Sequence, residues 1–448
     1  MRIDRLFTAA GAAMLTAGLV TAGITPAGAT FPGTNGDLVW AAICGPNGQQ
    51  LWSQANTTTG AQCPGGASPT YIVVTAGAAD SMPYFDSDGG MLYFSSNRAS
   101  ADNGIYEIPY PSTVTAGSPP TDNATQLTQL TSPAGYDYAP TVSADTGGAG
   151  TPTFMLFIHC ATTATTTGCG LEKLSPVSPA GTITAVSVAS SQPVLGPTNS
   201  NGVGPGNRPE IDPRNPDLVL YVDAQNHIHE MSLSGASLAG SLTGNSTAAS
   251  DVDLSFNSGI ATALTGGPAA DEHPDWAPDG QGVVFDSTRS PAAGTVCAGG
   301  TGTTPGSNTV FTMTNLGASP TVAQVWAKLV CGFSQIEVAY APADTYDATA
   351  QGPINGTTGN HIPPTLAWIA LNRGSNVQTI DDGTSVGAPV FVTQNATNNS
   401  EVIWQPTPPG AILPETPYAA LLPAAGGLVL LTGGLVLRRR RRQQRTAA

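Results

Sequence analysis

The histidines at positions 227 and 229 form the first group of side chains in this sequence that could do chemistry. They alternate, so on a strand both imidazoles would point to the same face, with Glu230 beside them. Imidazole nitrogens and carboxylate oxygens are ligands that zinc-like ions accept. A plainer interpretation is that His229 fills a packed position, because other parts of the chain carry an aromatic residue after an aliphatic one in the same way. Both interpretations stay open, and the sequence favours packing.

The aspartates next to two Asp-Gly turns form a second group, made of Asp86, Asp88, Asp275 and Asp279. Carboxylate oxygens suit hard cations, so these residues could line a calcium site. Aspartates more commonly fix a turn by accepting backbone N–H groups, and we expect that role here. The sequence requires no cofactor, and calcium is the one that these residues would accept.

Other polar residues give no enzymatic signature. His273, Arg208 and Arg98 could face a central channel or a binding loop, with a structural role as the alternative. The sequence contains no Gly-x-Ser-x-Gly elbow, no His-Glu-x-x-His motif, no P-loop and no dinucleotide fingerprint opening a helix. We therefore assign no catalytic residue.

An internal repeat must position these side chains. Residues 271–289 read DEHPDWAPDGQGVVFDSTR and residues 80–98 read DSMPYFDSDGGMLYFSSNR, each with a central Asp-Gly turn between two short apolar runs. This pattern predicts a β-hairpin. Weaker copies begin at 138–140 and 208–212. The prolines of the four copies, Pro83, Pro140, Pro209 and Pro274, are 57, 69 and 65 residues apart.

A further strand is expected after each hairpin, with an aliphatic residue followed by an aromatic one in the same slot. The pairs are Leu51 and Trp52, Ile105 and Tyr106, Ile228 and His229, and Val310 and Phe311. Short strands at a period near 65 residues predict an all-β propeller, whose blades bury their faces against one another. We expect six blades over residues 30–406, with seven as the alternative. Residues 365–372 read as a strand, residues 401–404 as another apolar strand, and residues 388–391 are expected to close the ring on 36–40.

The repeat resembles the TolB-type propeller repeat, in which a Pro-Asp-Trp-Ser-Pro-Asp-Gly hairpin precedes an apolar strand ending in Ser and Arg. The copies at 80–98 and 271–289 carry this resemblance. It implies protein–protein interaction in the cell envelope.

The two ends of the chain predict export and anchoring. Arg2 and Arg5 precede an apolar stretch and a small-residue site, which is typical of a signal peptide over residues 1–29. Residues 407–417 form a linker, 418–437 are uncharged and long enough to span a bilayer, and 438–448 form a basic tail expected on the cytoplasmic side.

The C-terminal segment resembles the cell-wall sorting signal of Gram-positive surface proteins, Leu-Pro-x-Thr-Gly followed by an apolar span and a basic tail. The corresponding residues are Leu413, Pro414, Glu415, Thr416 and Pro417. Pro417 departs from the glycine and makes the bond after Thr416 a tertiary amide. The resemblance implies a sortase partner and an actinobacterium-like Gram-positive cell. Without sortase cleavage, the same segment would hold the protein in the membrane.

Charge and cysteine content agree with an exported domain. Without the eight basic residues and one acidic residue of the terminal segments, 7 basic and 29 acidic residues remain, a net charge near −22, which excludes nucleic acid as a partner. Three local disulfides are the simplest pairing of the six cysteines, namely Cys44 with Cys63, Cys160 with Cys169, and Cys297 with Cys331.

These observations lead to one functional expectation and two alternatives. We expect a cell-surface-anchored, noncatalytic propeller that binds an envelope protein or a cell-wall glycan. The first alternative is an extracellular hydrolase or lyase that uses acidic residues in the propeller channel, which requires two converging carboxylates. The second is a structural wall protein without a specific ligand.

Overall fold

A computed structural model of the chain describes residues between Thr34 and Thr407. Residues 1–33 and 408–448 and many internal segments lie outside the described part, the longest of these segments being 111–126, 187–207 and 341–365. The predicted signal peptide, sorting motif, membrane segment and basic tail therefore lie outside it. Within the described residues, no helix has both the length and the apolar character needed to cross a membrane.

The described residues form six four-stranded antiparallel sheets, here named blades 1 to 6. From the inner strand outward, blade 1 contains β28 (Thr397–Thr407), β1 (Thr34–Ile43), β2 (Gln49–Ala55) and β4 (Thr70–Val73). Blade 2 contains β5 (Asp80–Phe85), β6 (Met91–Ser96), β7 (Gly104–Pro109) and β8 (Thr128–Gln129). Blade 3 contains β9 (Tyr136–Val142), β10 (Met155–Cys160), β11 (Cys169–Ser175) and β12 (Thr182–Ala185).

Blade 4 contains β13 (Glu210–Ile211), β14 (Leu218–Val222), β15 (Ile228–Ser232) and β16 (Asp251–Asp253), followed by the short helix α2 (Leu254–Asn257). Blade 5 contains β17 (Asp271–Trp276), β18 (Gly282–Ser287), β20 (Thr309–Thr314) and β21 (Thr321–Gln324). Blade 6 contains β23 (Ser334–Tyr340), β24 (Leu366–Leu371), β25 (Asn376–Ile380) and β26 (Val390–Phe391). Two small parallel pairs join β19 (Gly299–Gly300) to β22 (Val330–Cys331) and β3 (Ala61–Gln62) to β27 (Thr393–Gln394).

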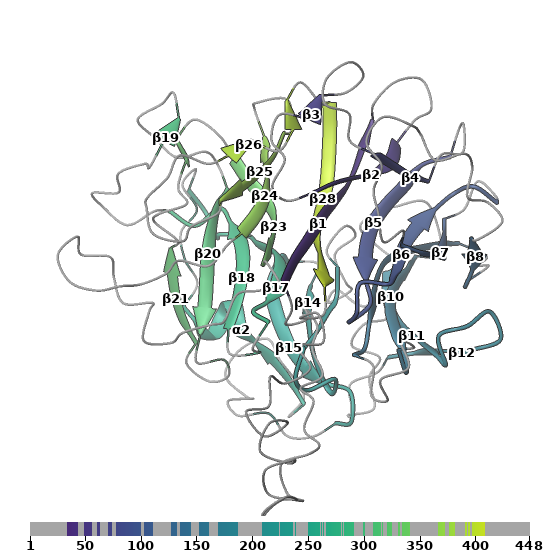
Figure 1. Cartoon of the computed structure of the whole chain (residues 1–448). Coiled ribbons are helices and arrows are strands. Elements are labelled where there is room, and N and C mark those ends of the chain that lie inside the picture. Colours follow the sequence, from purple (N-terminus) through teal and green to yellow (C-terminus); the bar gives the residue numbers. More distant parts are fainter. Residues whose placement is uncertain are drawn as a thin grey trace, which may run out of the picture. The chain divides into compact units, whose positions relative to one another are not determined.

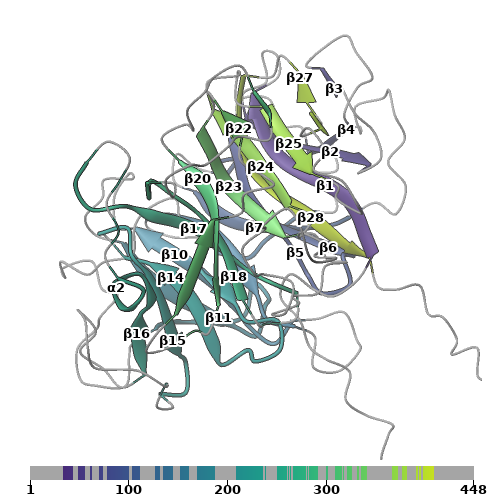
Figure 2. The same cartoon turned by 90° about the vertical axis from the view of Figure 1, so that its left-hand side faces the viewer.

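The first strand of each sheet contacts the first strand of the next, and the series closes on itself. It runs β28, β5, β9, β13, β17, β23 and back to β28. Figures 1 and 2 show the sheets that these strands begin. This closed arrangement of antiparallel sheets is a β-propeller, so the predicted all-β propeller is confirmed. The repeat spacing allows six or seven blades, and the described residues form six four-stranded sheets.

The ring is closed by pairing the two ends of the domain. β1 and β28, purple and yellow in Figure 1, lie side by side as antiparallel strands, with Leu38 opposite Trp404. The prediction that residues 388–391 close the ring is wrong, because β26 there is the outer strand of blade 6. Physically, β26 spans two residues and could not cover the ten of β1, whereas β28 spans eleven.

The core of the propeller lies between neighbouring blades. One apolar cluster joins Tyr93 and Ile105 of blade 2 to Met155 and Phe157 of blade 3. Another joins Leu220 and Val252 of blade 4 to Phe285 and Met313 of blade 5. Each blade therefore buries both faces only when its neighbours are present, as the repeat predicts.

The aliphatic–aromatic slot is confirmed by strand register. Trp52, Tyr106, His229 and Phe311 lie on the third strand of their blades, opposite Trp40, Phe94, Tyr221 and Phe285. In blades 2, 4 and 5 the two facing rings are stacked, with centroids 6.0, 4.9 and 5.9 Å apart. His229 thus fills an aromatic packing position.

Candidate functional site

Among the described residues, the inner strands of four blades share a kink that turns one side chain away from the direction of the regular strand. Met82, Ala139, His273 and Glu337 have positive φ angles of 52°, 54°, 48° and 53°, at the same place in β5, β9, β17 and β23. Each lies at or next to a shift of register with the second strand. Such β-bulges turn a side chain out of the regular alternation. The corresponding residue of blade 4, immediately before Pro209, is Arg208.

In blade 5 this kink brings together three side chains that could bind a metal ion. Glu272, His273 and Asp286 each offer one ligand atom, and these atoms all lie within 4.8 Å of one another. His273 Nδ1 is 2.7 Å from Asp286 Oδ1. The Asp286 carboxylate also accepts the backbone N–H of Glu337 at 3.1 Å and the side-chain amide of Asn308 at 3.1 Å. Asp286 is fully buried, while Glu272 and His273 are half-buried.

The electrostatics of this triad favour a charged histidine when no cation is bound. Burial acts to lower the pKa of His273, but the Asp286 carboxylate outweighs it and, with Glu337 and Glu272, raises that pKa to about 9. Burial raises the pKa of Glu272. The triad thus places one imidazole beside two carboxyl groups.

A second group of ionisable residues lies on or just before the inner strands of blades 2, 4 and 5. Arg208 donates to the backbone oxygen of Pro83 at 3.0 Å, lies over the ring of Tyr84 at 5.4 Å, and forms an ion pair with Glu210 at 3.4 Å. Burial raises the pKa of Glu210 well above its ordinary value; Arg208 opposes this shift and Asp275 adds to it. The two carboxylates of Glu210 and Asp275 are therefore close enough to interact.

The histidines of blade 4 lie in a buried cluster of aspartates. His229 is 5% exposed, and its Nδ1 is 3.2 Å from Asp251, while its Nε2 is 3.5 Å from Asp223 and 3.8 Å from Asp253. His227 Nδ1 pairs with Asp253 at 3.0 Å.

Glu230, which the sequence placed beside these histidines, interacts electrostatically with Asp212 instead. Burial together with Asp212 raises its pKa to about 7. Adjacent residues on a strand point to opposite faces, so Glu230 lies on the other side of β15 from His229.

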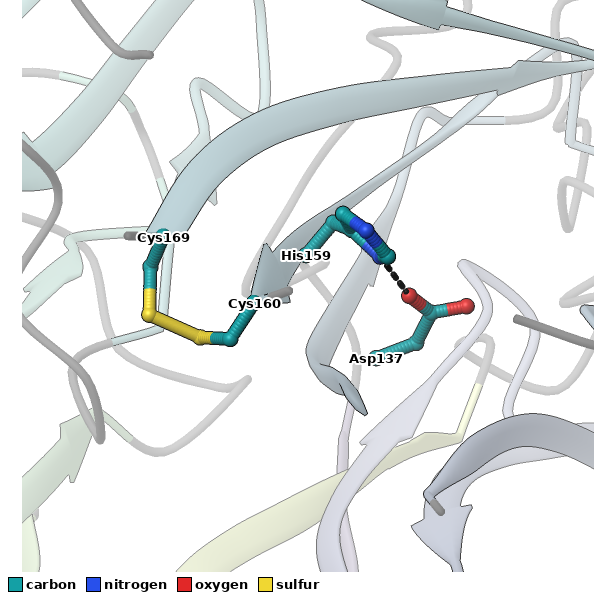
Figure 3. Close-up of a disulfide and its surroundings, with 4 residues drawn as sticks. All are labelled: Asp137, His159, Cys160 and Cys169. Carbon is teal, nitrogen blue, oxygen red and sulfur yellow. Dashed lines mark hydrogen bonds and ion pairs between the residues drawn. A yellow bond between two sulfur atoms is a disulfide. The ribbon is translucent and has the colours of Figure 1, made fainter. Parts of the chain in front are cut away.

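The remaining histidine of the described residues lies beside a disulfide in blade 3. Figure 3 shows His159 Nδ1 pointing to Asp137 Oδ1, 2.7 Å away, with Cys160 bonded to Cys169 on the adjacent strands. This disulfide is confirmed. Cys44, Cys63 and Cys297 lie outside the described residues, so the other two predicted pairs stay predictions.

The predicted turn aspartates of blade 2 hold their hairpin. Asp86 Oδ1 accepts the backbone N–H of Met91 at 3.0 Å, and Asp88 Oδ1 accepts that of Gly90 at 2.9 Å. Asp275 is buried on β17, away from the turn, and Asp279 lies outside the described residues. The calcium site stays a prediction.

The two arginines that follow the second strands of blades 2 and 5 are held in buried ion pairs. Arg98 forms a buried ion pair with Asp80, and Arg289 forms one with Asp271. Arg98 also lies over Phe94 and Tyr106, 5.3 Å from each ring centre. The arginines therefore link the inner strand of a blade to its aromatic slot.

Sequence reasoning singled out His273 but missed its two neighbours, Glu272 and Asp286. The signal was available in the repeat alignment, where Ser81, Met82 and Ser95 of blade 2 correspond to Glu272, His273 and Asp286 of blade 5. Three ligand-type residues replace three residues that bind metals poorly. The alignment does not reveal the kink, and it is the kink that brings these three positions to one side of the sheet.

Comparison with known proteins finds likeness in fold. No protein-family model and no curated protein matches the chain. TolB from Acinetobacter baumannii is 12% identical, with a TM-score of 0.43 over 83% of this chain and 67% of that one. Hydrazine synthase from Kuenenia stuttgartiensis is 10% identical, with a TM-score of 0.44 over 84% of this chain and 48% of that one. A puromycin-hydrolyzing peptidase from Mycobacterium tuberculosis is 11% identical, with a TM-score of 0.38 over 81% and 46%. The chain spans about half the length of the last two, and its own strand topology identifies it as a β-propeller.

Proposed function

We propose that the protein is a noncatalytic β-propeller, anchored at the cell surface, that binds a protein or a glycan of the envelope. The observation that carries this proposal is that charged residues along the inner strands are used to hold the propeller together. Arg98 with Asp80, Arg289 with Asp271, and Arg208 with Glu210 form pairs that are largely or fully buried. Breaking a buried pair of this kind leaves one charge without its partner, so these residues belong to the scaffold of the propeller.

The long connections between strands would supply the binding surface. Residues 111–126, 187–207 and 341–365 each join strands or blades and are rich in Thr, Ser, Gly, Ala and Pro. Connections carried on a rigid scaffold are where binding residues concentrate. The signal-peptide pattern of residues 1–29 and the sorting-like segment of residues 413–448 support the export and anchoring in this proposal.

Two experiments on cells that make the full chain test the proposal. In the first, Tyr346 is replaced by a photo-crosslinking phenylalanine, and Ile183, exposed on β12, is replaced in the same way as the control. We expect one dominant adduct from position 346, either a protein or muramidase-sensitive glycan, and no such adduct from position 183. Equal adducts from both positions would contradict a specific binding face.

The second experiment determines how the protein is held. The C-terminal peptide is analysed by mass after muramidase release and, in parallel, after detergent extraction. A peptide ending at Thr416 with a wall fragment would support sortase attachment, and a tail intact through Ala448 would support membrane anchoring. Recovery of the full chain from the medium without either treatment would contradict surface anchoring.

One observation favours the hydrolase or lyase alternative. The Glu210 and Asp275 carboxyls interact on adjacent inner strands, and Glu210 has the raised pKa that a general acid needs. If this pair were catalytic, Glu210→Gln would abolish cleavage of wall polysaccharide, while Glu107→Gln on β7 would leave it unchanged. Absence of cleavage by the parent protein would leave the binding function as the better account.

A further inference from the structure

The triad of Glu272, His273 and Asp286 is assembled by the backbone of blade 5. Adjacent residues on a regular strand point to opposite faces of the sheet. The left-handed backbone of His273, with φ of 48°, breaks this alternation, and Glu272 lies directly opposite Asp286 in the register of β17 and β18. These two features bring three ligand atoms within 4.8 Å.

Blade 2 makes the corresponding contacts without these charges. In blade 2, the position of Asp286 is taken by Ser95, whose hydroxyl accepts the backbone N–H of Ala139 on the next blade at 3.2 Å. Asp286 accepts the corresponding N–H of Glu337 at 3.1 Å. A neutral hydroxyl therefore performs the structural task, and Met82 occupies the same kink as His273. Blade 5 thus has two carboxylates and an imidazole at the positions where blade 2 has Ser81, Met82 and Ser95.

Blade 3 contains the same three residue types as the blade 5 triad, but in a different geometry. Blade 3 also holds a histidine and an aspartate in contact, His159 and Asp137, with Glu172 close enough to act on both electrostatically. Among the described residues, however, the blade 5 triad is the group whose ligand atoms gather closely enough for one metal ion. Both blades therefore contain a histidine, an aspartate and a glutamate near one another. Among the described residues, their ligand atoms converge on one point in blade 5.

We propose that Glu272, His273 and Asp286 bind one divalent transition-metal ion of the zinc type. An imidazole and two carboxylates suit such an ion, and three protein ligands leave a position for water or for a ligand group. Ligand atoms about 2.0–2.2 Å from a tetrahedral zinc lie roughly 3.5 Å apart, so the observed spacing needs only small side-chain rotations. Asn308, which donates to Asp286 Oδ2, orients that carboxylate, and the nearby Glu337 adds negative charge.

Cobalt and zinc binding to the full chain tests this site. The untagged protein is purified in detergent, stripped with a chelator and titrated with Co²⁺, followed by its visible absorption, and then with Zn²⁺ in competition. The decisive variant carries Glu272→Ser, His273→Met and Asp286→Ser, which reproduces the residues of blade 2 and so keeps the amide acceptor and a side chain that the kink accommodates. Glu172→Gln in blade 3 is the control.

We expect one equivalent of Co²⁺ to bind the parent protein and the Glu172→Gln control, and affinity to fall at least ~10-fold in the triple variant. Unchanged binding in the folded triple variant would overturn the proposal and point to other ligands, such as the blade 4 histidines. No saturable binding to the parent protein would also overturn it. If circular dichroism shows that the triple variant is unfolded, Glu272→Gln alone decides, because Glu272 is only half-buried and the same loss of affinity is expected.

Discussion

The hydroxyl of Ser95 accepts the backbone N–H of Ala139 on the next blade, at 3.2 Å. Asp286 and Glu337 repeat this contact between blades 5 and 6, at 3.1 Å. In both cases the N–H belongs to a residue with left-handed backbone, so the contact holds the kink of one blade against the second strand of the previous one. A second repeated contact supports it: the backbone oxygens of Asn103 and Asn226 accept the N–H groups of Asp137 and Asp271.

Ser95→Ala tests the contact between blades 2 and 3. The substitution leaves the buried N–H of Ala139 without its acceptor, and we expect the free energy of unfolding to fall by about 1–3 kcal/mol. Equilibrium denaturation in urea measures the change. Thr182→Ala, on the exposed face of β12, is the control and should change stability little. Equal effects of the two substitutions would show that the contact contributes nothing of its own.

The glycines of two equivalent hairpins should differ in their tolerance of alanine. Both have positive φ, 67° at Gly89 and 66° at Gly280. A Cβ on Gly89 would lie 2.1 Å from the backbone oxygen of Pro406 in β28, whereas one on Gly280 would meet a carboxylate oxygen of Asp212 at 2.8 Å. Side chains yield more easily than backbone, so Gly280→Ala should cost the ~1–2 kcal/mol of the left-handed conformation and Gly89→Ala clearly more. Thermal unfolding of the two variants side by side gives the comparison, and an equal loss would argue against close packing of β28 on this turn.

Replacement of Arg289 should destabilise blade 5 strongly. Its Nε and Nη2 donate to the two oxygens of Asp271 at 2.8 and 2.5 Å, and a third contact reaches Ser258. Arg289→Met leaves the buried Asp271 carboxylate with hydroxyl donors from Ser255 and Ser287 but without its cation, which costs about 3–5 kcal/mol. Arg289→Lys should restore only part of this, since an ammonium cannot make the same two-point contact. The double variant with Asp271→Asn should recover stability relative to Arg289→Met; further loss would contradict a direct pair.

Blade 4 should lose stability at alkaline pH. Burial acts to lower the pKa of His229, but the surrounding carboxylates outweigh it and raise the value to about 10 from an ordinary 6.5. A raised histidine pKa contributes stability that is fully present below pH 6.5 and declines as the pH rises toward 10. The groups facing the imidazole are Asp223, Asp251, Asp253, Tyr221 and His227.

The matched variant for this prediction is His229→Phe, which supplies the ring found at Phe311 but no charge. It should be several kcal/mol less stable than the parent at pH 6, because three buried aspartates lose their cation. The difference between the two proteins should shrink as the pH approaches 10. Unfolding measured from pH 6 to 10 checks this, and a constant difference across that range would show that the charge of His229 is not responsible.

Much of the fold follows from local chemistry. The Asp-Gly turn at 88–89 requires left-handed backbone that glycine supplies, and short apolar runs on each side pair as strands, so the hairpins of blades 2 and 5 could be placed from the residues alone. The regular recurrence of Pro83, Pro140, Pro209 and Pro274 was sufficient to predict a propeller. The aromatic slot that includes His229 and the disulfide between Cys160 and Cys169 were predicted for the same reason, since they join neighbouring strands of one repeat.

Tertiary structure decided what depends on contacts between distant segments. Which C-terminal strand pairs with β1 depends on length and register across the whole domain, and β28 rather than β26 satisfies both. The grouping of Glu272 and His273 with Asp286 depends on a bulge that no residue type announces, because methionine, alanine, histidine and glutamate all occupy it. The sequence thus determined the repeating unit, because the interactions that form a hairpin act over a few residues. Ring closure and the candidate metal site depend instead on how distant strands pack against one another.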